Sequence, residues 1–168
     1  MVIGQVYGIY VCDLVSGVEP PYGENPVSAV VVKAQEQERY LPLFMLAEAA
    51  NGIARYFQED RFCQPFTHDL LGQILRCWSG SIESVVIHGL QGTTYWAKLK
   101  IKIGTRIEEF DCRPSDAIAL GIRFNLPIGI ARSILERHGS DHWETAILQK
   151  APPDSVAAIR PMVPELAI

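Results

Sequence analysis

The segment from Pro114 to Asn125 constrains the fold most, because it has the spacing of a helix and almost no polar face. Its sequence is PSDAIALGIRFN, in which Arg123 is the one charged residue after Asp116. A helix that is apolar nearly all round is buried, either at the centre of a domain or against another subunit. A chain of 168 residues can bury such a helix, since a domain of this size covers roughly two-thirds of the surface that its unfolded form exposes. The sequence therefore predicts one domain in which this helix is buried.

Two parts of the chain share a pattern of strand, polar turn, strand and helix. Residues 30–54 can be laid over residues 98–122, and the pair Glu48–Ala49 then falls on Asp116–Ala117. Self-similarity of this kind is typical of a duplicated structural unit. Two β-β-α units joined by a helix at 67–78 predict an α+β fold with a mostly antiparallel sheet in a single compact domain. The hydrophobic pattern predicts strands at 2–12, 28–35, 39–45, 82–90, 93–103, 106–112 and 127–131, and helices at 46–58, 67–78, 114–125 and 132–139.

The ends of the chain and its charge narrow the class of protein. No run approaches the ~20 apolar residues that a membrane helix needs, and the first residues have the pattern of a strand rather than a signal peptide. We therefore expect a cytoplasmic protein without a membrane partner. The domain is expected to cover residues 1–140, and the tail at 141–168, with four prolines after Gln149, to be extended or partly disordered. The formal net charge of −4 argues against general attachment to nucleic acid but allows a local basic patch.

Charged residues gather at the start of the helix at 114–125, in the sequence DCRPSD. Pro114 suits the first helical position, and Asp116 in the first turn meets the positive end of the helix dipole. Arg113 can pair with Asp111 or with Asp116, so capping and a local ion pair explain all three charged residues. A functional site is the other explanation, since charged groups beside a buried helix persist only if they are paired, hydrogen-bonded or bound to a metal.

The segment PFTHDLL at residues 65–71 raises the same choice. Thr67 as N-cap and Asp69 in the first turn are explained by helix capping, whereas His68 is not needed for it. A lone histidine near a helix start is more often a surface residue than a ligand. Combined with the acids of the chain, His68 would give a carboxylate-rich site that suits Mg²⁺ or Mn²⁺ better than a thiolate-preferring metal. The expected metal ligands are Glu48, Asp111 and Asp116.

The strand at 93–103 alternates more regularly than any other. Its small and aliphatic residues point one way, and the opposite, basic face consists of Trp96, Lys98, Lys100 and Lys102. Three lysines and an indole could contact phosphates and stack on a base of DNA or RNA. An ordinary solvated strand face, or an edge strand protected by lysines, has the same pattern. The sequence leaves both interpretations open.

Four segments in this order resemble the bifunctional nuclease domain family: RYLPLFMLAEAANGIA, QPFTHDLLGQIL, VVIHGLQGTTYWAKL and FDCRPSDAIALGIRFNLPI. The resemblance covers about residues 2–135, and its last motif is long and distinctive. It implies a compact α+β domain that usually self-associates, with DNase and RNase activity in some members. The chain departs from the family pattern where Phe44 and Met45 make the junction before the helix acid bulkier. The positions that carry the family motif are Glu48, Thr67, His68, Asp69, Asp111, Arg113, Ser115 and Asp116.

These features together predict a metal-assisted nuclease that hydrolyses phosphodiester bonds in DNA and RNA with low sequence selectivity. Mg²⁺ or Mn²⁺ would activate water, His68 would act as general base or additional ligand, and Arg113 would stabilise charge on the phosphate. The basic face with Trp96 would guide the substrate. The alternative is a non-catalytic oligomeric module that binds a partner protein or an anion at Arg113 and the helix-start N–H groups. With either function, we expect a homo-oligomer, a dimer or larger. The expected catalytic residues are His68, Asp69, Asp111, Arg113 and Asp116.

Overall fold

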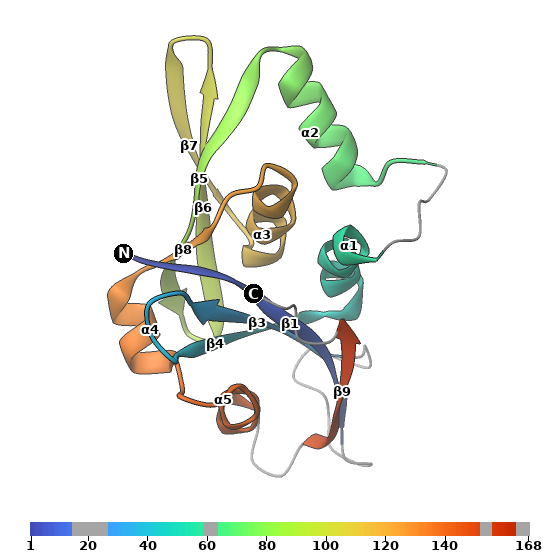
Figure 1. The fold of residues 1–168 in the computed structure, drawn as a ribbon, viewed down its shortest axis with the longest axis vertical. Helices are drawn as coiled ribbons and strands as arrows, with labels where there is room; N and C mark the ends of the chain where they lie inside the picture. The colour runs from blue at the N-terminus through green and yellow to red at the C-terminus, as the bar shows by residue number, and fades with distance from the viewer. Residues whose placement is uncertain (15–26, 59–63, 152–155, 164–168) are drawn as a thin grey trace.

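Eight strands form one sheet in the computed structural model, which describes residues 1–14, 27–58, 64–151 and 156–163 (Figure 1). The strands are β1 Val2–Leu14, β3 Val27–Ala34, β4 Tyr40–Leu46, β5 Gly80–Gln91, β6 Thr94–Ile103, β7 Arg106–Cys112, β8 Ile128–Ile130 and β9 Val156–Val163. Their order across the sheet is β4-β3-β1-β8-β5-β6-β7, and β9 pairs with β1 outside this path. Among the described pairings, that of β5 with β8 is parallel and the others are antiparallel.

Five helices within the described residues pack on this sheet: α1 Ala47–Phe57, α2 Thr67–Cys77, α3 Pro114–Arg123, α4 Arg132–His138 and α5 Trp143–Lys150. In the same ranges, no helix combines the length and the apolar character that crossing a membrane requires. Helices α1 and α3 cover one face of β3 and α5 covers the other, because Val30 and Val32 belong to one apolar cluster and Ala29 and Val31 to a second. The molecule is thus a single compact α+β domain with a mostly antiparallel sheet, which confirms the predicted fold class.

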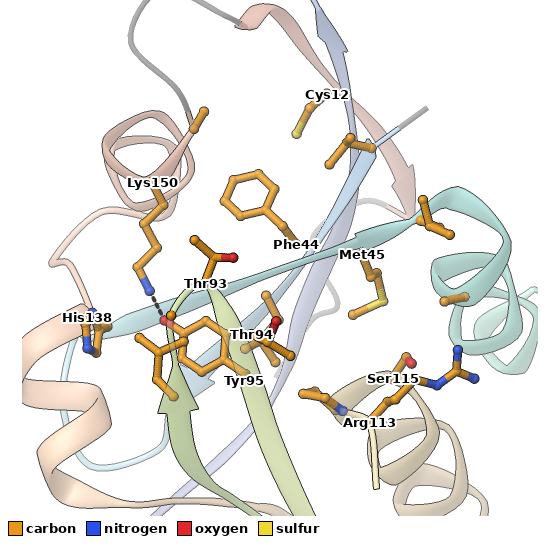
Figure 2. A pocket seen from close by; sticks show the side chains of 18 of the residues that line it. Cys12, Phe44, Met45, Thr93, Thr94, Tyr95, Arg113, Ser115, His138 and Lys150 are labelled. Carbon is orange, nitrogen blue, oxygen red and sulfur yellow. Dashed lines mark hydrogen bonds between the residues drawn. The ribbon is translucent and has the colours of Figure 1, made fainter. Parts of the chain in front are cut away.

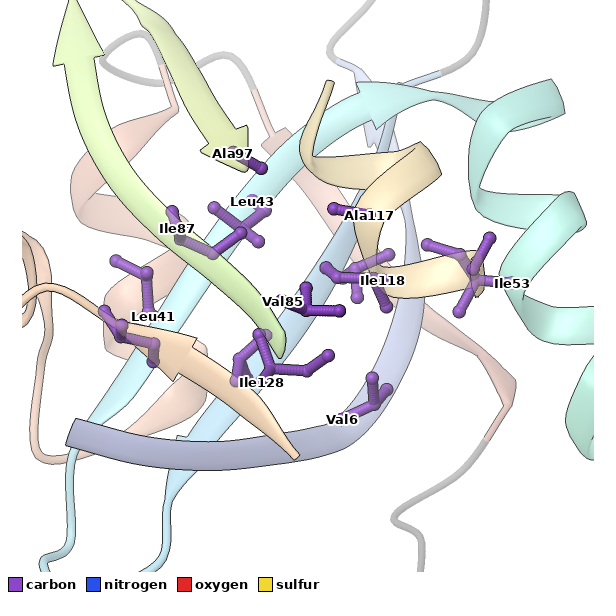
Figure 3. Close-up of a cluster of buried hydrophobic side chains, with 14 of the residues drawn as sticks. Val6, Leu41, Leu43, Ile53, Val85, Ile87, Ala97, Ala117, Ile118 and Ile128 are labelled. Carbon is purple, nitrogen blue, oxygen red and sulfur yellow. The ribbon is translucent and has the colours of Figure 1, made fainter. Parts of the chain in front are cut away.

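Helix α3 lies at the centre of the larger apolar cluster (Figure 3). Ala117 and Ile118 have no exposed surface, and Ile118 lies between Val85 of β5 and Ile53 of α1. Gly121 lets the helix approach β5 closely, since a Cβ there would lie 2.8 Å from Val85 Cγ2. The prediction of a buried helix in this segment is therefore confirmed.

Both predicted β-β-α units are present. The first consists of β3, β4 and α1, and the second of β6, β7 and α3, with an antiparallel strand pair in each. Their burial differs greatly, because β3 is buried almost throughout, whereas every residue of β7 except Cys112 is exposed. The reason is their surroundings: helices cover β3 on both faces, while β7 is an edge strand of the sheet.

The tail at 141–168 differs from the extended or partly disordered arm that its prolines predict. It contains helix α5 and strand β9, and β9 pairs antiparallel with β1. Helix α5 packs in the smaller apolar cluster, and Arg160 of β9 donates to both carboxylate oxygens of Asp13, at 2.5 and 2.6 Å. Contacts with residues that are distant in the sequence thus order this segment, and local propensity does not predict such contacts. Residues 152–155 and 164–168 of the tail lie outside the described part of the chain.

Helix α2 has the predicted position, but most of its apolar face is exposed. It lies at the periphery of the fold, beside the projecting part of the β5–β7 strands (Figure 1). Leu75 is buried, at 8% exposure. The exposed fractions of the other apolar residues of this face are 49% for Leu70, 48% for Leu71, 39% for Ile74 and 68% for Trp78. The sequence indicates that a face is apolar but not whether another part of the chain covers it.

Candidate functional site

The start of α3 carries the predicted charged cluster. Arg113 is the N-cap residue and Pro114 occupies the first helical position, as helix capping requires. The Arg113 guanidinium donates to both carboxylate oxygens of Asp116, from Nε to Oδ2 at 2.7 Å and from Nη2 to Oδ1 at 3.0 Å. The side chain of Arg113 remains 75% exposed, whereas that of Asp116 is 27% exposed. Of the two partners that the sequence allows for Arg113, the structure therefore selects Asp116.

His68 joins this cluster from α2. Its Nε2 lies 3.2 Å from Asp116 Oδ1, the oxygen that also accepts from Arg113 Nη2. Gly52 of α1 faces the Nδ1 edge of the ring, where a Cβ would make ordinary van der Waals contact at 3.5 Å with Nδ1 and with Cε1 of His68. Burial alone would raise the pKa of Asp116, but hydrogen bonds from Arg113 and His68 hold it below its usual value. Asp116 is thus ionised at neutral pH, and the three residues His68, Arg113 and Asp116 are called the helix-start cluster below.

Asp69 has other partners. One of its carboxylate oxygens accepts from the backbone N–H of Phe66 at 3.0 Å, and the other accepts from Arg123 Nε at 2.5 Å. The Arg123 side chain is 7% exposed and also donates to the carbonyls of Ala119 and Gly52. Burial alone would raise the pKa of Asp69, whereas the hydrogen bonds from Arg123 and Phe66 lower it. These contacts connect α2 to α1 and α3, so Asp69 holds the helices that carry the cluster.

Thr67 and Ser115 also belong to the family motif but are not part of the helix-start cluster. Thr67 is the first residue of α2 rather than its N-cap, which is Phe66. The turn is closed by Asp69, which reaches back to the Phe66 N–H in the manner of a capping box. Ser115 is 6% exposed and lines a cavity beside the start of α3.

Asp111 lies on the other face of the sheet from Asp116. In the register of β6 and β7 it is paired with Lys98, and directly opposed residues project from the same face. Lys98 points away from α3, because its neighbour Ala97 is buried in the cluster that surrounds α3. The Asp111 carboxylate lies 3.3 Å from Nε2 of His88, on β5. The sheet therefore separates the two acids that the sequence places near one proline.

The predicted metal ligands are not gathered at one point. In the part of the chain that the structure describes, no group of three or more His, Cys, Asp and Glu residues is arranged to hold a metal ion. Asp111 and Asp116 each have an ion-pair partner on their own side of the sheet. Glu48 is exposed, and the pKa of Arg113 is raised chiefly by its bond to Asp116 and to a smaller extent by the charge of Glu48. These residues do not fit a preformed Mg²⁺ or Mn²⁺ site.

The basic face of β6 has the predicted alternation. Trp96 is 41% exposed, whereas Ala97 has no exposed surface. The ammonium groups of Lys98 and Lys100 lie 3.1 and 4.0 Å from the carboxylate of Glu109 on β7, so a neighbouring strand partly neutralises their charge. Because this face is opposite to the one that packs against α3, a nucleic acid bound there would lie on the other side of the sheet from the helix-start cluster.

Sequence reasoning missed two partners in this region, Arg123 and His88. Arg123 carried a signal, because a single charge on an otherwise apolar helix requires a partner, and Asp69 is that partner. His88 follows the buried Ile87 on β5, so alternation alone places it on the outward face with Asp111. Choosing between the acids of that face requires the strand register, which the sequence does not contain.

Comparisons with known proteins identify the family of this chain. Residues 30–142 match the family model described as the bifunctional nuclease domain, a range that includes the whole helix-start cluster. Two uncharacterized proteins of Mycobacterium tuberculosis, from strains CDC 1551 and H37Rv, are each 31% identical over 118 residues, which is 69% of this chain and 70% of the relative. The family description suggests a nuclease-like function. The chain therefore belongs to the bifunctional nuclease domain family.

Proposed function

We propose that this chain hydrolyses phosphodiester bonds in DNA and RNA with low sequence selectivity, and that the helix-start cluster is its active site. One observation carries the proposal: Asp116 Oδ1 lies 3.2 Å from His68 Nε2 and 3.0 Å from Arg113 Nη2. A side chain that can take up a proton and one that can bind a phosphate are thereby held by one ionised carboxylate. The family description supports the same class of reaction.

In this mechanism Arg113 binds the scissile phosphate. Its side chain is 75% exposed, and the guanidinium keeps N–H donors that Asp116 does not use. Asp116 favours the tautomer of His68 in which Nε2–H donates to Oδ1, so the lone pair is on Nδ1. His68 takes a proton from water as the water oxygen bonds to phosphorus, and Arg113 stabilises the charge on the phosphate oxygens. The P–O ester bond then breaks, the leaving oxygen takes a proton from solvent water, and His68 releases to the solvent the proton that it accepted.

The test is an assay of rigorously purified protein on single- and double-stranded DNA and RNA, with Mg²⁺, with Mn²⁺ and with EDTA. We expect cleavage that persists in EDTA, because His68 supplies the base and Arg113 supplies the positive charge on the phosphate in the proposed mechanism. Cleavage that is lost in EDTA and restored by Mn²⁺ would instead support the metal-assisted mechanism that the carboxylates predict. A folded protein that cleaves none of these substrates would favour the alternative, a non-catalytic module that binds an anion at Arg113.

We further propose that the chain forms a homo-oligomer through the exposed apolar face of α2, since apolar patches of this kind mark association surfaces. Leu71→Glu is expected to convert the oligomer to a monomer in sedimentation velocity, because a carboxylate buried without a partner is costly. Gln73→Glu adds the same charge at an exposed position of the same helix and is expected to leave sedimentation unchanged. A monomeric wild-type protein, or an oligomeric Leu71→Glu variant, would contradict this surface.

A further inference from the structure

A cavity of about 510 Å³ lies between β4, the turn from β5 to β6, the start of α3 and the end of α5 (Figure 2). Its volume is in the range of small-molecule sites. Phe44, Met45 and Leu90 contribute apolar walls, and no aspartate or glutamate is among the described residues that line it. Arg113 reaches one end, but its charge is already paired with Asp116. The cavity is therefore mainly apolar and contains no negative charge from the described chain.

Lys150 at the end of α5 provides a cation at the other end of the cavity. Its ammonium group donates to the hydroxyl of Tyr95 and lies 4.8 Å from the centre of the Tyr95 ring (Figure 2). Within the described ranges, no carboxylate forms an ion pair with it. Burial lowers the pKa of Lys150 to about 8 and raises that of Tyr95 to about 12, so both groups are mainly protonated at pH 7. A partly buried cation that has no carboxylate partner among the described residues favours binding of an anion.

The Tyr95 hydroxyl adds a second donor. Because its oxygen accepts from Lys150, its own hydrogen is directed elsewhere and can be donated to a ligand. His138 lies edge-on to the Tyr95 ring, with the ring centres 6.2 Å apart. Burial, followed by the charges of Lys150 and Arg137, lowers the pKa of His138, so this imidazole is mainly neutral at pH 7 and adds no further charge. Ammonium and hydroxyl together form a compact pair of donors beside an apolar wall.

We infer that this cavity binds a small amphipathic monoanion, with its carboxylate on Lys150 and Tyr95 and its apolar body against Phe44, Met45 and Leu90. A medium-chain saturated fatty acid has this chemistry. The carboxylate oxygens accept from both donors and neutralise the ammonium group, while the hydrocarbon chain removes apolar surface from water. A polyphosphate ligand is a poor match, because mostly apolar walls and two cations at opposite ends of the cavity, one of them paired with Asp116, would leave its other charges unsatisfied.

The site does not depend on the proposed nuclease activity. Lys150 lies outside residues 30–142, the part that matches the family model, and on a helix that the sequence pattern did not predict. Of the helix-start cluster, Arg113 lines one end of the cavity, whereas His68 and Asp116 do not line it. The inferred ligand class thus depends on Lys150 and on the packing of α5 against the domain.

Decanoate and 1-decanol, which share a hydrocarbon chain, are the probes in isothermal titration calorimetry of the full chain at pH 7 without nucleic acid. The wild-type protein is expected to bind both, and decanoate more tightly. Lys150→Met is expected to weaken decanoate binding by at least about tenfold, the value of one charge-assisted hydrogen bond, and to leave 1-decanol binding within about twofold. Lys102→Met, which removes an exposed lysine of β6, is the matched control and is expected to change neither.

Tyr95→Phe is the second variant, because it keeps the ring and removes one donor. It is expected to weaken decanoate binding by about fivefold. If Lys150→Met does not fold, Tyr95→Phe alone tests whether this pair of donors binds the carboxylate. Equal decanoate affinity in the wild type and in the folded variants would overturn the recognition of an anion. A wild-type protein that binds neither probe would overturn the site itself. Since the titration contains no nucleic acid, an absence of nuclease activity would leave the inference intact.

Discussion

Asp116→Asn is expected to reduce cleavage of DNA and RNA by at least about 100-fold, the lower end of what a positioned acid–base pair contributes. The asparagine has nearly the same shape but cannot carry the charge that orients Arg113 and favours a protonated Nε2 on His68. Both partners would lose their alignment at once. Initial rates on a fluorescently labelled oligonucleotide, measured at equal protein concentration, give the comparison.

Asp141→Asn is the matched control for this change. Asp141 also accepts from an arginine, Arg39, at 3.0 Å, but its side chain is 71% exposed and neither residue belongs to the helix-start cluster. Cleavage is expected to remain at the wild-type rate in this variant. Asp116→Asn itself is expected to melt within about 4 °C of the wild type, because Arg113 is exposed enough to be hydrated. Full activity in a folded Asp116→Asn protein would exclude the proposed role of the cluster.

Asp69→Asn is expected to lower the free energy of unfolding by about 3 kcal/mol at pH 7, since removing the carboxylate leaves the buried charge of Arg123 without its counterion. Arg123 is 7% exposed and cannot be rehydrated without moving α2 away from α3. Urea denaturation monitored by tryptophan fluorescence measures the difference. Asp13→Asn, which removes the same kind of bond from the exposed Arg160, is expected to have a smaller effect.

The effect of Asp69→Asn also has a defined pH dependence. The pKa of Asp69 is lowered in the folded state, so its ionised form contributes stability that is fully present above the unfolded pKa of about 4. This contribution is lost as the pH falls through the lower, folded pKa. Wild type and variant are therefore expected to differ by a constant amount above about pH 5 and to converge in acid. A variant with unchanged stability but lost cleavage would give Asp69 a catalytic role instead.

Much of the fold follows from local pattern. The apolar residues of α3 and the alternation of β6 are strong periodic signals, and both elements lie within two residues of their predicted ends. Capping chemistry also located Pro114 and Asp116 correctly. The pattern did not reveal α5 and β9, because a segment with four prolines is ordered here by contacts with β1 and the smaller apolar cluster.

The contacts of the candidate site could be predicted only where the two residues are close in the sequence. The pairing of Asp116 with Arg113 spans three residues and is a local property, whereas its contact with His68 spans 48. Asp111 is close to Asp116 in the chain but on the opposite face, because alternation along β7 and the turn into α3 separate them. Lys150 and Tyr95 are 55 residues apart, and no short motif joins them. Side-chain partners across the sheet thus depend on register and not on spacing along the chain.

Strand β1 has a consequence for the order of events during synthesis. Asp13 and its partner Arg160 are 147 residues apart, so the part of β1 that pairs with β9 lacks this neighbour for roughly 7–30 s after it leaves the ribosome at usual elongation rates. Contacts of such high sequence separation also slow folding in the finished chain. The half-formed sheet would meanwhile present an open strand edge to other molecules. Its protection during this interval falls to chaperones or to transient cover by neighbouring segments, and the lysine of the apolar cavity arrives in the same late segment.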